Sequence, residues 1–187
     1  MGHRVCPWWL GWFLISPLRR FAHDPERIVG PFLRPGMVAV DFGCGMGHFS
    51  LPMARMAGRS GRVVCVDAQE KMLAGLRRRA AKAGLAERIE LRGVTAEETG
   101  LSDLPGRVDF VLLMFVVHEV PDRGRLFRDL VAALAPGGRL LLAEPVFHVR
   151  EKAFAETVAA AEKAGLTVLD RPAVRRARAV LLGADVA

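Results

Sequence analysis

The sequence predicts an open α/β fold in which parallel strands alternate with helices. The main observation is residues 38–50, where a short apolar strand runs into a glycine-dense turn and leaves as a helix. A second observation is the continuous apolar run at 62–67, which is typical of a parallel strand buried on both faces. A strand, a glycine turn and a helix at the carboxyl edge of a sheet form the usual nucleotide crevice of open α/β proteins.

Composition limits the remaining possibilities. The chain has 187 residues, which suits one domain, and its 51% apolar content can supply a sizeable core. Its 27 Lys and Arg exceed its 20 Asp and Glu, and the net charge of +7 would suit an anionic partner such as RNA, phospholipid or an acidic substrate. The arginines are scattered, however, which favours solvated basic faces. Cys6, Cys44 and Cys65 are an odd set without C-x-x-C spacing, so we expect no disulfide, no metal site and a cytoplasmic protein.

Residues 5–18 are an apolar run that contains every tryptophan of the chain. The run is shorter than the roughly 20 residues of a membrane span, and no A-x-A-like signal cleavage site follows it. We therefore expect a short helix, with residues 1–29 forming a helical cap segment. Our hypothesis is that this segment covers the mouth of the active site, with Trp8 and Trp12 against the substrate. Core packing and peripheral membrane contact are the alternatives.

Start and stop signals place the elements of the first half of the chain. We expect a helix from Asp24, a strand over 38–42, a helix from the glycine turn to about 57, a strand over 62–67 and a helix over about 69–83. Asp24 is the N-cap of the first helix and Pro25 lies in its first turn, whereas Gly84 caps the last. The side chains expected inside are Ile28, Val29, Phe32, Leu33, Phe49, Leu51, Met53, Met72, Leu73 and Leu76.

The second half continues the alternation. We expect strands over 89–93 and 108–114, a helix over about 122–134, a strand up to 145, a helix over about 151–164 and a closing antiparallel pair at 166–169 and 177–182. Pro136-Gly137-Gly138 should break the chain between the helix and the strand that follows it. The basic run Arg77-Arg78-Arg79 is interpreted as a solvated helix face.

The glycine turn argues against a dinucleotide. Its spacing is G-x-G-x-G, at Gly43, Gly45 and Gly47, whereas the dinucleotide fingerprint would require its third glycine at His48. Asp41 closes the strand and would place a carboxylate near a pyrophosphate, which is electrostatically unfavourable. A cationic or zwitterionic cofactor fits this turn better.

This turn, together with a second acidic strand end at Asp67, resembles the class I S-adenosylmethionine-dependent methyltransferases. The segment Leu-Ala-Pro-Gly-Gly-Arg-Leu-Leu-Leu-Ala-Glu-Pro at 134–145 closely resembles the fifth-strand motif of that family. The resemblance covers roughly residues 30–183. It implies an α/β, Rossmann-like three-layer sandwich at 30–187, with a seven-stranded, mostly parallel sheet and an antiparallel last strand.

The resemblance also implies a site for the cofactor, S-adenosyl-L-methionine. Asp67 would accept hydrogen bonds from the ribose diol, Asp41 would hold the ammonium end, and amides of the glycine turn would hold the carboxylate. Thr95 stands where the family often has Asp or Asn facing the adenine. The expected cofactor-binding residues are Asp41, Gly43, Cys44, Gly45, Gly47, Asp67, Ala68, Thr95, Ala96 and Met114.

The segment after the fourth strand bears on the methyl acceptor. Methyltransferases that modify nucleobase amino groups often carry an Asn- or Asp-Pro-Pro-aromatic turn here, and this chain has none. Its His-Glu-Val-Pro-Asp segment at 118–122 resembles the small-molecule methylases, including the ubiquinone/menaquinone biosynthesis type. His118 is either a general base or a histidine that only orders the loop. Glu144 either contacts substrate or caps a loop.

We therefore expect methyl transfer from S-adenosylmethionine to a small, apolar or aromatic acceptor by in-line displacement. An RNA methyltransferase that uses the basic surface is the first alternative; a basic stripe with aromatic stacking positions would favour it. A cofactor-binding partner subunit without its own turnover is the second; cofactor binding without activity, in a stable hetero-complex, would favour it. A dehydrogenase is the third alternative. The sequence does not define the oligomeric state.

Overall fold

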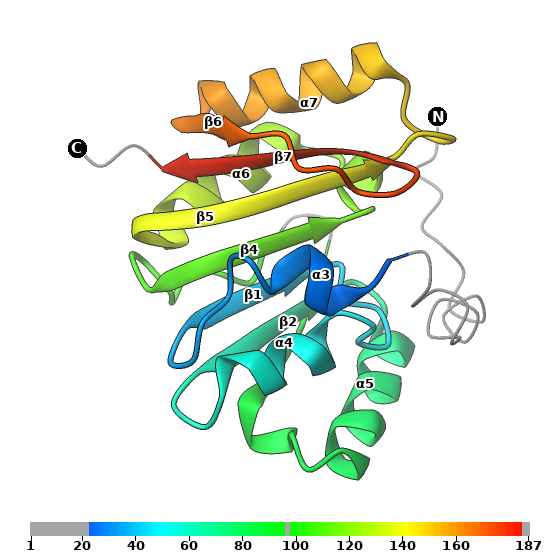
Figure 1. Cartoon of the computed structure of the whole chain (residues 1–187), viewed down its shortest axis with the longest axis vertical. Coiled ribbons are helices and arrows are strands. Elements are labelled where there is room, and N and C mark those ends of the chain that lie inside the picture. Colours follow the sequence, from blue (N-terminus) through cyan, green and yellow to red (C-terminus); the bar gives the residue numbers. More distant parts are fainter. Residues whose placement is uncertain (1–22, 96–97, 185–187) are drawn as a thin grey trace. The chain divides into compact units, whose positions relative to one another are not determined.

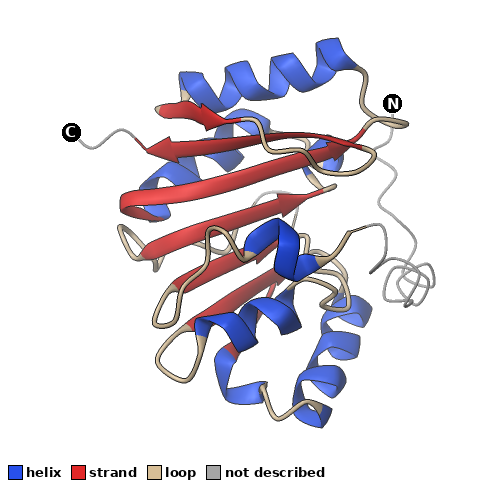
Figure 2. Ribbon diagram, viewed as in Figure 1, coloured by secondary structure: helices blue, strands red, loops and turns tan. Residues whose placement is uncertain are grey.

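The computed structural model describes residues 23–95 and 98–184 (Figure 1). These residues divide into two compact units, an N-terminal unit that ends at Gly100 and a C-terminal unit that begins at Leu101. In both units helices flank hydrogen-bonded strands (Figure 2). The expected boundary of a cap segment at residue 29 stays a prediction, because residues 1–22 lie outside the described part of the chain.

The elements of the N-terminal unit are α3 (Pro25–Val29), β1 (Val38–Phe42), α4 (Ser50–Ala57), β2 (Arg62–Asp67), α5 (Glu70–Lys82), η2 (Ala86–Arg88) and β3 (Ile89–Gly93). The strands have the order β3-β2-β1 and all pair in parallel. The Asp24 side chain accepts a hydrogen bond from the amide of Glu26 at 3.0 Å, which confirms the N-cap. Gly84 has φ of +65° just after α5, as a helix-ending glycine should.

The core of this unit follows the predicted pattern with two exceptions. Along β1 and β2 every interior position is buried, and α4 and α5 pack on these strands through the expected apolar faces. Ile28 and Phe32, however, are only half-buried. The reason is that α3 ends at Val29: the amides of Phe32 and Leu33 both donate to the Val29 carbonyl, so the chain turns before a second helical turn forms.

The elements of the C-terminal unit are β4 (Val108–Met114), η3 (Val117–Glu119), α6 (Arg123–Ala133), β5 (Leu134–Pro145), α7 (Glu151–Lys163), β6 (Leu166–Asp170) and β7 (Ala177–Ala184). The strands have the order β4-β5-β7-β6. β4 and β5 are parallel, whereas β7 is antiparallel to both β5 and β6. The amide of Arg125 donates to the Asp122 side chain at 2.8 Å, which caps α6.

The prediction that Pro136-Gly137-Gly138 forms a break between the helix and the following strand is wrong. β5 already begins at Leu134, and the pairing with β4 jumps from Val108↔Leu134 to Phe110↔Arg139. The glycines therefore lie in a bulge of the strand, not in a loop before it. A Cβ atom on Gly138 would lie 2.8 Å from the Ala135 carbonyl oxygen and 2.9 Å from that of Val108, so only glycine fits.

The described strands confirm the predicted fold class, a mostly parallel seven-stranded α/β sheet with an antiparallel last strand. In the C-terminal unit, β4 and β5 end side by side, with Met114 paired to Ala143. Residues that follow these strands therefore share the carboxyl edge of this sheet. Among the described residues, no helix has both the length and the apolar character that crossing a membrane requires.

Candidate functional site

The glycine turn of the N-terminal unit joins β1 to α4. Gly43, Gly45 and Gly47 have φ of +77°, +53° and +82°, a region that side chains rarely adopt. A Cβ atom on Gly47 would lie 2.3 Å from Leu76 Cδ1 of α5, so Gly47 is needed for packing. Among the described residues, no atom lies within 4 Å of a Cβ atom on Gly45, so this glycine leaves open space on that part of the structure where a ligand can approach the backbone.

The amides of the turn are largely used by the protein itself. The amides of Gly43 and Cys44 donate to the Val66 carbonyl at 2.8 and 3.1 Å, and that of Gly47 donates to the Cys44 carbonyl at 3.0 Å. These bonds fix the turn to the end of β2. The expected hydrogen bonds from the turn to a cofactor carboxylate thus stay a prediction. The three amides named here already donate to backbone carbonyls, so other amides of the turn would have to supply these bonds.

Asp67, at the end of β2, faces the same turn. Its Oδ2 accepts from the amide of Gly45 and its Oδ1 from that of Gln69, both at 2.8 Å. Burial raises the pKa of Asp67, and the two backbone hydrogen bonds oppose that shift. Each carboxylate oxygen has two lone pairs, so both can still accept a hydroxyl of a ligand. The sequence placed Asp67 at this edge, and the structure ties it directly to the open glycine.

Asp41 lies deeper than Asp67. It is 3% exposed, and the hydroxyl of the fully buried Ser50 donates to its Oδ2 at 2.5 Å. Sequence reasoning missed Ser50, although a polar residue between Phe49 and Leu51 on a buried helix face was a usable signal. The role of Asp41 at the ammonium end of a cofactor stays a prediction.

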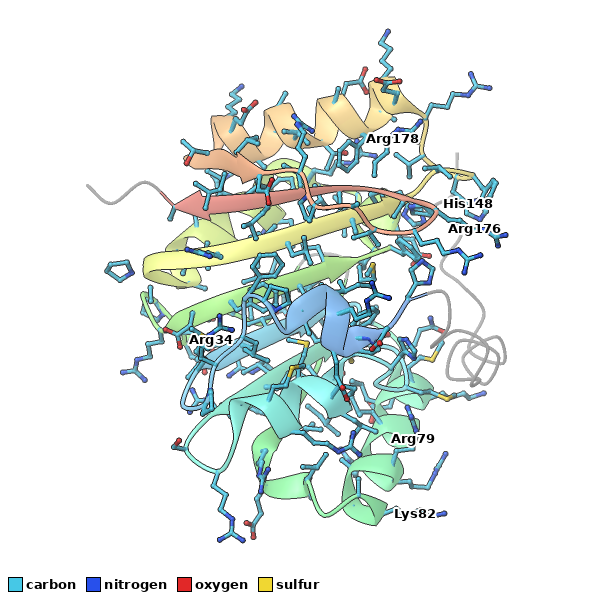
Figure 3. All side chains as sticks on the ribbon, in the orientation of Figure 1. Arg34, Arg79, Lys82, His148, Arg176 and Arg178 are labelled. Carbon is cyan, nitrogen blue, oxygen red and sulfur yellow. The ribbon has the colours of Figure 1, made fainter. Side chains whose placement is uncertain are left out.

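Helix α5 holds the turn from one side, which the sequence did not suggest. Arg79 donates from Nη1 to the carbonyl of Met46 inside the turn, while Arg77 and Arg78 are exposed. Figure 3 labels Arg79 on α5. The solvated-face interpretation is therefore wrong for Arg79. It lies three residues after Leu76, so the helical period already put it on the face that packs on the turn.

The other expected cofactor residues differ in their surroundings. Cys44 is 7% exposed, and burial followed by a hydrogen bond with Cys65 raises the pKa of its thiol well above the ordinary value. The thiol therefore stays protonated and is a packing group, not a nucleophile.

The remaining predicted cofactor residues that the structure describes are only placed by it. Ala68 and Thr95 are exposed near the ends of β2 and β3. Met114, 6% exposed, ends β4 in the C-terminal unit. Ala96, Trp8 and Trp12 lie outside the described residues.

His48 connects the turn to the chain that precedes α3. Its Nε2 lies 2.9 Å from the carbonyl oxygen of His23, the first described residue, and the His48 ring packs edge-on against Phe49. The backbone at the beginning of the described chain is therefore fixed beside the glycine turn. Sequence reasoning gave His48 no such role.

In the C-terminal unit, His118 and Glu144 form a close pair at the carboxyl edge. His118 Nδ1 lies 2.5 Å from Glu144 Oε2, and the amide of His118 donates to Glu144 Oε1 at 3.2 Å. Glu144 is 1% exposed, whereas the His118 side chain is 28% exposed. The hydrogen bond to Glu144 raises the pKa of His118; burial lowers it, and the charges of Glu144 and Glu119 raise it further.

The loop around His118 shows how the pair is placed. Phe115 has φ of +63°, a strained value for phenylalanine, and its amide donates to the Ala143 carbonyl at 2.9 Å. This turn directs the chain into η3 and brings His118 over the end of β5. The His148 ring stacks on that of His118, with centroids 6.3 Å apart and an interplanar angle of 6°. The structure adds a role to the two that the sequence left open for Glu144: its carboxylate is the hydrogen-bond partner of His118.

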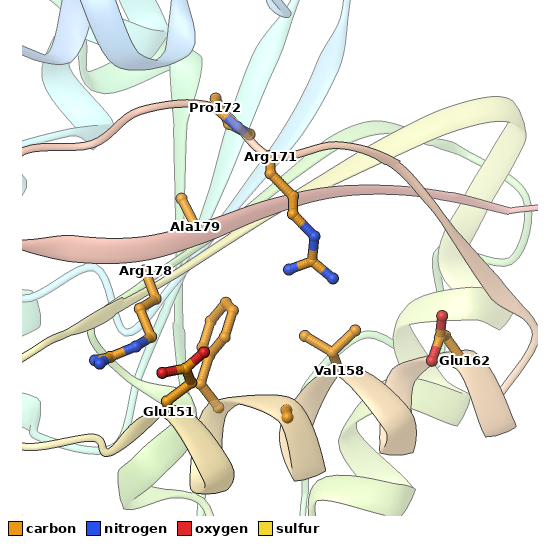
Figure 4. Close-up of a pocket in the computed structure, with 9 residues that line it drawn as sticks. Glu151, Val158, Glu162, Arg171, Pro172, Arg178 and Ala179 are labelled. Atoms are coloured by element: carbon orange, nitrogen blue, oxygen red, sulfur yellow. The ribbon is translucent and has the colours of Figure 1, made fainter.

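A separate groove of about 750 Å³ lies between α7 and the β6–β7 region of the C-terminal unit (Figure 4). Phe154 and Val158 of α7 form its apolar side, and the guanidinium of Arg171 points into it. None of the predicted site residues that the structure describes lines this groove. Within the described residues, no three His, Cys, Asp or Glu side chains are grouped as metal ligands.

Comparisons with known proteins agree with this geometry. The sequence model of the family described as "Methyltransferase domain" matches residues 39–138. A ubiquinone biosynthesis O-methyltransferase of Caulobacter sp. (strain K31) is 38% identical over 75% of this chain and 52% of its own length. A ubiquinone/menaquinone biosynthesis C-methyltransferase of Cronobacter sakazakii is 30% identical over 73% of this chain and 53% of its own length. The chain thus spans about half the length of these curated relatives.

A solved structure shows the same fold over nearly the whole chain. The crystal structure of a SAM-dependent methyltransferase from Aquifex aeolicus superposes with a TM-score of 0.84 at 23% identity, covering 98% of this chain and 100% of that one. The resemblance inferred from the glycine turn and the fifth-strand motif is therefore confirmed. The chain belongs to the methyltransferase-domain family of S-adenosylmethionine-dependent methyltransferases.

Proposed function

We propose that this chain transfers the methyl group of S-adenosylmethionine to a hydroxyl group of a small, apolar or aromatic acceptor, with His118 as the general base. The observation that carries the proposal is the 2.5 Å contact between His118 Nδ1 and the buried Glu144 carboxylate. A hydroxyl oxygen becomes a strong nucleophile only when it loses its proton, so O-methylation benefits from such a base. The Caulobacter relative is named an O-methyltransferase and the Cronobacter relative a C-methyltransferase, so it is the base, and not the names, that favours oxygen as the acceptor atom.

The N-terminal unit fits the cofactor. The open side of Gly45 lets a ligand lie against the backbone, and the Asp67 oxygens can accept two hydroxyl groups of a ribose. Asp67 and Gly45 are therefore the residues that would hold S-adenosylmethionine, and Asp41 is buried near the end of the neighbouring strand β1. When bound, this cofactor supplies a methyl group on a positively charged sulfur, from which an oxygen nucleophile can displace it.

In the C-terminal unit, Glu144 determines which nitrogen of His118 is the base. A carboxylate can only accept a hydrogen bond, so Nδ1 carries the proton, and Nε2, which lies 3.9 Å from Glu119 Oε1, keeps a lone pair when the ring is neutral. In this role Nε2 would take the hydroxyl proton of the acceptor, and the bound cofactor would supply the methyl group that the acceptor oxygen receives. The negative charge of Glu144 stabilises the imidazolium that results, as the aspartate does for the histidine of a Ser-His-Asp triad.

The N-terminal segment completes the proposal for the acceptor. Trp8 and Trp12 would line the acceptor pocket and exclude water from the displacement reaction. Their placement stays a prediction; what supports it is the contact of His48 with the His23 carbonyl, since the segment enters the described chain beside the glycine turn. Deleting residues 1–20 should leave cofactor binding intact and lower turnover or acceptor selectivity. A cytoplasmic location is part of the same proposal.

The test has two stages. Calorimetry should show binding of S-adenosylmethionine and its demethylated product, and little binding of NAD; preferential NAD binding would refute the cofactor assignment. A panel of phenols and catechols should then reveal methyl transfer to oxygen, followed by release of the demethylated cofactor. Cofactor binding without transfer to any acceptor, together with a stable hetero-complex, would instead indicate a partner subunit without its own turnover. Transfer to RNA would indicate the remaining alternative.

A further inference from the structure

The turn after β5 exposes a large apolar side chain that the proposed function does not use. Phe147 is 76% exposed and its neighbour Val146 is 37% exposed. Single exposed apolar residues are common on protein surfaces and mean little by themselves. Here two adjacent ones lie at the tip of a turn that is held firmly in place, and that combination needs an explanation.

Hydrogen bonds on both sides fix this turn. The amides of His148 and Val149 both donate to the Pro145 carbonyl, at 3.1 and 2.9 Å. On the β7 side, the amide of Val146 donates to the Arg176 carbonyl at 3.1 Å, and Arg178 Nη1 donates to the Val149 carbonyl at 2.9 Å. Phe147 is therefore presented to solvent by a rigid turn and is not exposed because of a loose loop.

Exposed arginines lie near the tip. Residues 145–150 and 171–178 contain Arg150, Arg171, Arg175, Arg176 and Arg178; the acidic residues that adjoin these ranges are Asp170, which accepts from the Arg171 amide, and Glu151, which lines the α7 groove with Arg171 and Arg178. Arg150, Arg175 and Arg176 are exposed, and Figure 3 shows Arg176 beside His148 at the same edge of the unit. We call Val146, Phe147, His148, Arg150, Arg175 and Arg176 the Phe147 patch. It combines an apolar tip with a cationic rim, the composition of segments that dock at membrane interfaces.

From this surface we infer that the Phe147 patch docks on an anionic lipid surface, with Phe147 and Val146 inserted at the level of the headgroups and the arginines against lipid phosphates. Charge complementarity carries the choice of partner. Nucleic acid fits less well, because sites for single strands repeat their stacking aromatics, and among the described residues Phe147 is the only exposed large aromatic side chain.

The position of the patch gives the docking a purpose. His148 belongs to the patch and stacks on His118, so the base lies directly behind the surface that would face the lipid. An apolar acceptor dissolved in the bilayer could then reach the base without crossing water. This purpose rests on the proposed function, whereas the docking itself does not.

The experiment is vesicle co-sedimentation of the full chain, without cofactor or acceptor, using phosphatidylcholine vesicles with and without phosphatidylglycerol. Wild-type protein should bind the vesicles that contain phosphatidylglycerol and be released at high salt. Phe147→Ala should weaken this binding by about tenfold, from the lost burial of one aromatic ring. Arg150→Gln/Arg176→Gln should weaken it by about fivefold per arginine.

Matched controls separate the patch from general surface effects. Leu169→Ala removes another exposed apolar side chain, 52% exposed, and Arg77→Gln/Arg78→Gln removes two exposed charges from α5; both should bind like wild type. Equal binding of Phe147→Ala and Leu169→Ala would overturn the inference. So would binding that depends only on residues 1–20, or arginine-dependent binding to single-stranded RNA that is unaffected by Phe147→Ala. Turnover on a soluble phenol, measured without vesicles, shows separately whether the proposed function holds.

Discussion

The glycine turn of the N-terminal unit is built mostly from backbone, whereas the His118 site of the C-terminal unit is built from side chains. In the first, positive φ angles at Gly45 and Gly47 and amide bonds to Asp67 define the shape. In the second, a histidine and a glutamate 26 residues apart meet because β4 and β5 end in register. Changes in the first should therefore alter cofactor affinity or stability, and changes in the second should alter turnover.

The largest expected effect is on turnover at the side-chain site. His118→Ala should lower the methyl-transfer rate by about 10²–10⁴-fold, because the acceptor hydroxyl loses its base. Cofactor affinity measured by calorimetry should hardly change, since His118 does not belong to the glycine turn. An unchanged rate would mean that His118 only orders the loop. A loss of cofactor affinity would contradict the proposal that the N-terminal unit determines cofactor affinity and the C-terminal unit determines turnover.

The next effect is on stability at the backbone site. Gly47→Ala should lower the free energy of unfolding by about 2–5 kcal/mol, from the strain of a positive φ and the clash with Leu76. Gly84→Ala is the control, because Gly84 has a similar φ of +65° but no atom of the described chain within 4 Å of an added Cβ, and the change should cost only about 1–2 kcal/mol. Urea titrations measure both. Equal losses would mean that α5 does not need a glycine at position 47.

A smaller effect is expected at the ribose contact. Asp67→Ala should weaken cofactor binding by about 1.5–3 kcal/mol, as expected for lost hydrogen bonds to a charged group. Turnover at saturating cofactor should fall much less than in His118→Ala. Asp170→Ala, which removes another carboxylate at a strand end, should bind cofactor normally. If both aspartate variants bind equally well, Asp67 is not the ribose residue.

The smallest effect concerns stability and pH. Because Glu144 raises the pKa of His118, the pair stabilises the fold fully below about pH 6.5, the ordinary histidine value, and this contribution is lost as the pH rises through the raised pKa. Glu144→Gln keeps a hydrogen-bond acceptor but removes the charge. Compared with this variant, wild type should lose about 1.4 kcal/mol per unit of pKa elevation across that window. Urea midpoints over a pH series check this, and parallel curves for the two proteins would contradict it.

The same contrast explains what the sequence could predict. The strands, the helix caps and Asp67 follow from local patterns, because each depends on residues close in the chain. The Ser50–Asp41 and Arg79–Met46 contacts depend on how helices pack on the turn. Arg79 is half-buried, but its position in a run of three arginines made it look like part of a solvated face.

The C-terminal site was less accessible to sequence reasoning. His118 and Glu144 were each recognised at a strand end, but their pairing depends on the register of β4 with β5 and on the turn at Phe115. The bulge at Pro136-Gly137-Gly138 shifts that register by several residues, and no local pattern specifies by how many. The exposure of Phe147 likewise depends on the hydrogen bonds between the turn after β5 and β7.

The most direct test of the account is the pH dependence of single-turnover methyl transfer to a phenol at saturating cofactor, for wild type and Glu144→Gln. A histidine base must be neutral, so the rate should rise with pH through the pKa of His118 in the bound complex. For wild type the midpoint should lie above about 6.5, and Glu144→Gln should move it down while cofactor affinity stays unchanged. Identical midpoints for the two proteins, or a rate independent of pH, would contradict the assignment of His118 and Glu144 as the base.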